Sequence, residues 1–69
     1  MSPLLLRKVW TVINNTQASV LLELSDRELI KRLLSQVSIQ QSLSQEESHL
    51  LDIYLHGKIP LIRDIAEAS

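Results

Sequence analysis

The chain has few residues that can form tight turns, because it contains only one glycine and two prolines among 69 residues. Two-residue β-hairpin turns need glycine or another residue that tolerates positive φ, so strands would have little to connect them. Apolar residues make up 45% of the chain, and most of them are leucine, isoleucine or valine. This composition predicts an all-α protein, a compact bundle or orthogonal array of four to five short helices.

The length predicts a single helical domain over residues 1–69, because so short a chain cannot be divided into two hydrophobic cores. Disulfides are excluded as a source of stability, since the chain has no cysteine. The segment MSPLLLRKVW carries its apolar residues before its basic ones, the reverse of a secretory signal. No uncharged stretch is long enough to span a bilayer. We therefore expect a cytoplasmic protein without a transmembrane segment.

The first helix is predicted to begin at Ser2 and Pro3, because serine is a favoured N-cap and proline suits the first helical position. Leu4 lies on its polar side. The polar run NNT then ends the helix, and Thr16 is placed to cap a second one. A buried strand remains an alternative for residues 17–24. The broad apolar face of the first helix consists of Leu5, Leu6, Val9, Trp10, Val12 and Ile13.

Two capping boxes mark the starts of the next two helices. Ser25 with Glu28, and Ser44 with Glu47, have the Ser-x-x-Glu pattern, in which each side chain satisfies the other residue's free backbone N–H. The first of these helices should end near residue 38, where the apolar stripe stops. The core between the two helices is predicted to consist of Leu29, Ile30, Leu33, Leu34, Val37, Leu50, Leu51, Ile53, Tyr54 and Leu55.

The fourth helix is predicted to end at Gly57, because glycine readily adopts the left-handed conformation that closes a helix. Pro60 would then open a fifth helix. In that helix the outward residues would be Arg63, Asp64 and Glu67, and the inward residues Leu61, Ile62, Ile65 and Ala68.

His49, Asp52 and His56 are the only residues whose spacing suggests a metal site, but they belong to the polar side of the fourth helix. The two histidines are separated by about 10.5 Å of helical rise, which is too far for both to bind one ion. We expect a solvated face with an Asp52–His56 pairing, and no metal or cofactor. With no cysteine, scattered serines and no glycine-rich phosphate loop, we do not expect an enzyme.

A protein-interaction function is the remaining expectation: an adaptor or regulatory subunit that binds an unidentified protein partner and forms a homodimer. The chain has more aliphatic side chains than such short helices readily bury within one molecule. Dimerisation would bury the remaining apolar surface. Internal packing and attachment to a membrane surface are alternatives for the same face of the first helix. The predicted interface consists of Leu5, Leu6, Val9, Trp10 and Ile13.

A DNA-binding regulator of helix-turn-helix type is the alternative from another class. Its basic cluster would be Arg27, Lys31 and Arg32, although Glu28 is placed to pair with either of the last two. A reading helix that begins QEESH would present two glutamates to the phosphates. The net charge is −1. We therefore do not expect nucleic-acid binding.

Overall fold

The computed structural model describes residues 2–68, which form four α-helices and no strand. The helices are α1 (Pro3–Asn15), α2 (Ala18–Glu23), α3 (Asp26–Gln40) and α4 (Gln45–Glu67). The Cα radius of gyration is 11.2 Å, close to the roughly 11 Å of a compact chain of this length. The expected all-α class is confirmed. Residues 18–23 are helical, so the strand alternative for this segment is wrong.

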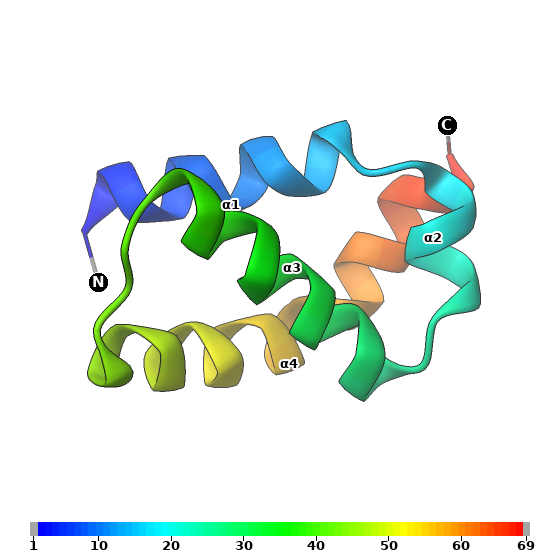
Figure 1. The fold of residues 1–69 in the computed structure, drawn as a ribbon. Helices are drawn as coiled ribbons and strands as arrows, with labels where there is room; N and C mark the ends of the chain where they lie inside the picture. The colour runs from blue at the N-terminus through cyan, green and yellow to red at the C-terminus, as the bar shows by residue number, and fades with distance from the viewer. Residues whose placement is uncertain (1, 69) are drawn as a thin grey trace.

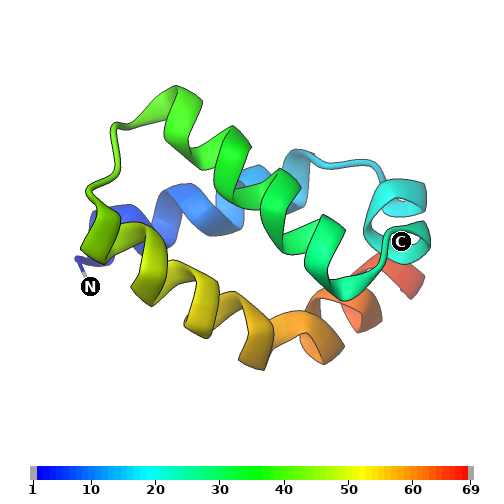
Figure 2. The same ribbon diagram turned by 60° about the horizontal axis from the view of Figure 1, so that its bottom comes forward.

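The helix α3 is the central element of the fold, because it packs against both α1 and α4. Figure 1 shows α3 crossing in front of α1 and α4, with its chain direction opposite to theirs. The short α2 packs against α4. In Figure 2, α1, α3 and α4 form the long sides of the bundle, and α2 closes one end. The helices α1 and α4 pack less closely against each other than either packs against α3, which leaves a seam between them on the side away from α3.

Serine side chains cap three of the four helices, as the sequence predicted. The Ser2 hydroxyl oxygen accepts from the backbone N–H of Leu5, in the first turn of α1, at 3.1 Å. At Ser44 the capping box is complete, because its hydroxyl accepts from the Glu47 N–H at 3.1 Å and the Glu47 carboxylate accepts from the Ser44 N–H at 3.0 Å. Ser25 also accepts from the Glu28 N–H, but there the carboxylate accepts from the hydroxyl instead of the backbone.

The helix ends near α2 and α3 differ from the prediction in detail. Thr16 does not cap α2. Its hydroxyl donates to the carbonyl oxygen of Val12 at 2.7 Å, and the N-cap is Gln17, without a side-chain hydrogen bond. The helix α3 continues to Gln40, about half a turn beyond the predicted end, because exposed polar residues are tolerated in a last helical turn.

The predicted break at Gly57 is wrong, because α4 is one helix that contains both Gly57 and Pro60. No glycine among residues 2–68 has a positive φ. Pro60 is exposed, so the carbonyl oxygen of His56 that lacks its N–H partner can be solvated. Packing explains the continuity: one buried stripe with helical spacing runs the length of α4, and consists of Leu51, Leu55, Ile59, Ile62 and Ala66.

Gly57→Ala is expected to stabilise the protein by about 0.5–1 kcal/mol, because glycine in a helix interior is less favourable than alanine by this amount. A Cβ atom at this position would meet nothing within 4 Å. Thermal unfolding followed by circular dichroism, at a concentration low enough for the single chain to predominate, measures the change. A clear decrease in the melting temperature would instead support the left-handed C-cap that the sequence suggested.

The predicted core is largely confirmed. Of its ten residues, eight are buried or packed against the core, whereas Leu50 and Ile53 are wrong, with 42% and 57% of their surface exposed. The five predicted residues on α4 span about 200° of the helix circumference, which is more than one face of a helix can bury. All four helices contribute to the core, which consists of Leu5, Val9, Val12, Ile13, Leu21, Leu29, Ile30, Leu33, Val37, Leu51, Leu55, Ile59, Ile62 and Ala66.

The predicted orientation of the last helical segment is also wrong in part. Ile62 is buried as expected, but Leu61 and Ile65 are 46% and 38% exposed. Ala68 is exposed as well. Since α4 is continuous, the buried stripe that starts at Leu51 determines which residues face inward after Pro60.

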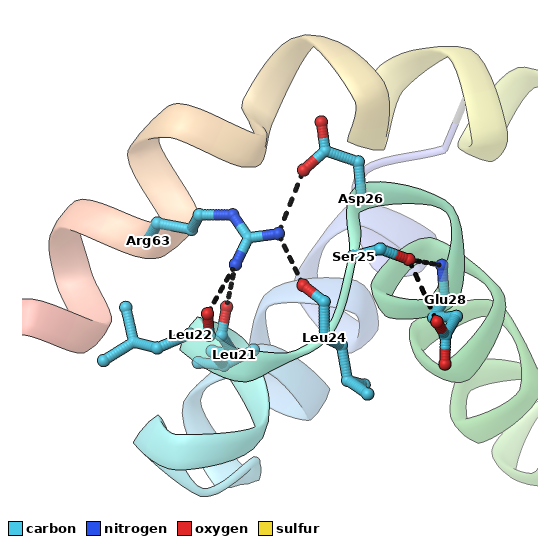
Figure 3. Close-up of polar contacts among 7 residues, drawn as sticks. All are labelled: Leu21, Leu22, Leu24, Ser25, Asp26, Glu28 and Arg63. Atoms are coloured by element: carbon cyan, nitrogen blue, oxygen red, sulfur yellow. Dashed lines mark hydrogen bonds and ion pairs between the residues drawn. The ribbon is translucent and has the colours of Figure 1, made fainter.

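Arg63 was expected to face outward, but it joins the C-terminal half of α4 to the α2–α3 corner (Figure 3). Its guanidinium donates to the carbonyl oxygens of Leu21, Leu22 and Leu24 at 2.8–3.1 Å and to the Asp26 carboxylate at 2.9 Å. These carbonyl groups lie at the end of α2, where the helix itself supplies no partners. Arg63 therefore caps α2 from another helix and fixes the start of α3.

Candidate functional site: the α1–α4 face

A partly exposed apolar surface follows the seam between α1 and α4. The side chains of Leu50, Tyr54 and Leu61 project from the same side of α4. Their directions differ by at most about 40° around the helix axis, at 100° of rotation per residue. The opposite flank of α4, with Asp52 and His56, borders α3. On α1, Val12 and Asn15 border α3, so the other flank faces the seam. We call the seam surface the α1–α4 face, and it consists of Leu6, Trp10, Leu50, Tyr54, Leu61 and Ile65.

The centre of the α1–α4 face is an aromatic pair. The indole Nε1–H of Trp10 donates to the Tyr54 hydroxyl oxygen at 3.0 Å. Both side chains are half-buried and pack against the core. The Lys58 ammonium lies 5.7 Å from the centroid of the Tyr54 ring, within cation–π range. The two aromatic side chains of the chain thus bridge the seam, and their hydrogen bond holds them in one arrangement.

Tyr54→Phe is expected to destabilise the protein by about 1 kcal/mol, because it removes the acceptor of the Trp10 N–H and keeps the ring. The free energy of unfolding and the Trp10 fluorescence spectrum measure the effect. The double variant Trp10→Phe/Tyr54→Phe completes a cycle that isolates the pair interaction. Unchanged stability together with an unchanged spectrum would show that the hydrogen bond contributes nothing in solution.

The residues of the predicted interface on α1 separate into two groups. Leu5, Val9 and Ile13 are fully or almost fully buried, so these three residues pack inside the core of the single chain. Leu6 and Trp10 are half-buried and lie on the α1–α4 face. Contact of these two with a partner stays a prediction.

The α4 half of the face was not recognised from the sequence. Leu50, Leu61 and Ile65 were all expected to face inward, and each is exposed by more than a third of its surface. The spacing of the buried stripe was the available signal. If the helical spacing of Leu51 and Leu55 is extended past Gly57, the buried stripe does not include these three residues.

The histidines of α4 lie where the sequence predicted. His49 and His56 are exposed, and Asp52 is half-buried. The His56 Nδ1 lies 2.9 Å from the Asp52 carbonyl oxygen and 3.4 Å from its carboxylate. This geometry confirms the predicted pairing. Within residues 2–68, no three potential metal ligands lie close enough to hold an ion.

The basic residues of the DNA-binding alternative lie together on the outward side of α3. Arg27, Lys31 and Arg32 are all exposed. The expected pairing of Glu28 with Lys31 or Arg32 is wrong, because the ion pairs between residues 2 and 68 are those of Arg63 with Asp26 and of His56 with Asp52. Within this described part of the chain, the three cations therefore have no carboxylate partner.

In the described part of the chain, α4 is the longest helix, and neither it nor any other helix is long and apolar enough to cross a membrane. No protein-family model matches the sequence, and comparisons with curated proteins and with solved structures found no match.

Proposed function

We propose that the protein is a small cytoplasmic protein–protein interaction module, an adaptor or regulatory subunit, which binds a second copy of itself and a partner protein through the α1–α4 face. The exposure of Leu50, Leu61 and Ile65 beside the Trp10–Tyr54 pair is the observation that carries this proposal. Contiguous exposed apolar surface on a small domain is typical of interaction sites. Partly buried aromatic side chains at the centre of such a surface supply rigid anchors.

Self-association is supported by the size of the chain and by Gly57. A small domain without disulfides commonly gains stability from oligomerisation, and a two-fold dimer needs only one self-complementary patch. Gly57 lies next to the face on α4, where an added Cβ atom would meet no atom of residues 2–68 within 4 Å. Nothing in the packing of the single chain requires glycine there, whereas a missing side chain allows another helix to approach closely.

A concentration series of amide spectra by nuclear magnetic resonance tests where two copies meet. With increasing concentration we expect shifts for the Trp10 indole N–H and for the amides of Leu50 and Leu61, with the outward side of α3 unaffected. The variant Leu50→Glu/Leu61→Glu should abolish these shifts, because it places charge in the interface. Leu4→Glu is the matched control, since Leu4 is 68% exposed on another side of α1. Shifts spread over all four helices would contradict a defined interface.

The partner protein is identified with the same variants as bait in affinity capture from the source cell. We expect a protein that is retained by the wild type and by Leu4→Glu and is lost from Leu50→Glu/Leu61→Glu. All three substituted positions are exposed, so the fold should tolerate them. Identical retention by the three baits would show that the α1–α4 face does not bind that protein.

A further inference from the structure

We propose that the outward side of α3 is a second binding surface, independent of the α1–α4 face, and that it binds an acidic, leucine-containing segment of a protein. It lies on the side of the bundle away from the seam (Figure 1). We call it the α3 surface, and it consists of Leu24, Arg27, Lys31, Arg32 and Leu34.

The first reason is a cluster of cations that form no ion pair within the described residues. Arg27, Lys31 and Arg32 are exposed within about two turns of one helix. In residues 2–68, none of them has an ion pair. Glu28, one of the two acidic residues adjacent to Arg27 in sequence, accepts from the Ser25 hydroxyl at 3.2 Å. The surface therefore has cations that an external anion can pair with.

The other carboxylates beside the α3 surface also have partners in the chain. Asp26 binds the Arg63 guanidinium at 2.9 Å. Asp52 pairs with His56, with 3.4 Å between the Nδ1 and the carboxylate oxygen. Among residues 2–68 these carboxylates therefore pair with groups other than the three cations, which stay available to an external anion.

The second reason is the position of apolar side chains, which favours a protein segment over nucleic acid. Leu34 lines a groove on one side of Lys31, and Leu24 lines a groove on the other side. Both leucines are half-buried. A segment with carboxylates for the cations and leucines for the two grooves matches this arrangement.

A phosphate backbone matches the surface less well. Glu28 lines one of the grooves and Asp52 lines the other, so a continuous row of phosphates would meet both carboxylates. Discrete carboxylates of a peptide can avoid them. Three cations also provide few of the phosphate contacts that duplex binding uses, which number about 6–10 in proteins that bind DNA strongly.

Titration of the ¹⁵N-labelled protein with a synthetic peptide rich in glutamate and leucine tests this proposal. We expect saturable shifts in residues 24–36 and at Asp52 and His56, and weaker binding at higher salt. Arg27→Glu/Lys31→Glu should weaken the peptide affinity by about tenfold or more. The control Arg7→Glu/Lys8→Glu makes the same change in net charge, but on α1, and should leave the peptide affinity unchanged. Leu50→Glu/Leu61→Glu should also leave the peptide affinity unchanged.

Three results would overturn the proposal. The first is the absence of saturable shifts with the peptide. The second is equal weakening by the α1 control, which would indicate a non-specific charge effect. The third is tighter binding of a short DNA duplex than of the peptide, with a steep salt dependence, which would assign the surface to nucleic acid. None of these outcomes depends on the α1–α4 face, so the proposed function is tested separately.

Discussion

Arg63→Ala is expected to lower the free energy of unfolding by about 2–3 kcal/mol, because it removes charge-assisted hydrogen bonds to three carbonyl oxygens at the end of α2. The Asp26 ion pair adds little, since that carboxylate is mostly exposed. A chain of this length has only roughly 3–10 kcal/mol of stability in total. The melting temperature should therefore fall by about 10–20 °C.

Two variants separate the capping role of Arg63 from a general charge effect. Arg27→Ala removes an exposed arginine that has no ion pair among residues 2–68, and it should change the melting temperature little. Asp26→Asn keeps the three carbonyl contacts and should cost less than about 1 kcal/mol. Equal melting temperatures for Arg63→Ala and Arg27→Ala would mean that Arg63 does not hold α2 against α4 in solution.

Leu51→Ala is expected to destabilise the protein by about 2–5 kcal/mol, which is the range for removal of a fully buried leucine side chain. At the upper end of this range most of the protein molecules would be unfolded at room temperature. Urea unfolding followed by circular dichroism at 222 nm, a standard helical band, measures the change in the transition midpoint at a concentration low enough for the single chain to predominate.

The neighbouring residue provides the matched control for this substitution. Leu50→Ala removes the same atoms one position away, from a side chain that is partly exposed, and should cost less than about 1 kcal/mol. The pair thus tests the direction in which α4 faces the core. Similar costs at the two positions would contradict the orientation of α4.

The features that depend on a few neighbouring residues were predictable from the sequence. The serine caps and the Ser44–Glu47 box involve residues three positions apart, so the pattern contains the whole interaction. The absence of turn residues was likewise enough for the all-α class. The buried stripe of α3 followed from its helical spacing.

The features that depend on distant residues were not predictable. Gly57 carried a local signal for a helix end, and packing of the residues on both sides of it against the core outweighed that signal. Because a helix end was assumed at Gly57, the helical spacing of the buried residues was not continued beyond it. Leu61 and Ile65 were therefore expected to face the core, whereas both are exposed. Arg63 caps a helix whose carbonyl groups lie 39 to 42 positions earlier, and no local pattern marks such a contact.

The candidate site combines the two cases. Leu6 and Trp10 lay at the edge of a recognisable apolar face, so the sequence placed them near an interface. The contact of Trp10 with Tyr54 joins residues 44 positions apart, so it was not predictable from the sequence. The cations of α3 formed a recognisable cluster in the sequence, but the contacts of Asp26 and Glu28 with other groups of the described chain were not predictable.

The mass of the protein in solution tests the α1–α4 face most directly, as measured by light scattering coupled to size exclusion. We expect the wild type and Leu4→Glu to show twice the chain mass of 7.9 kDa at high micromolar concentration. Leu50→Glu/Leu61→Glu should show the mass of one chain and retain the helical circular dichroism spectrum. A wild type that remains at the single-chain mass at the highest soluble concentration, or a double variant that still forms the dimer, would contradict self-association through this face.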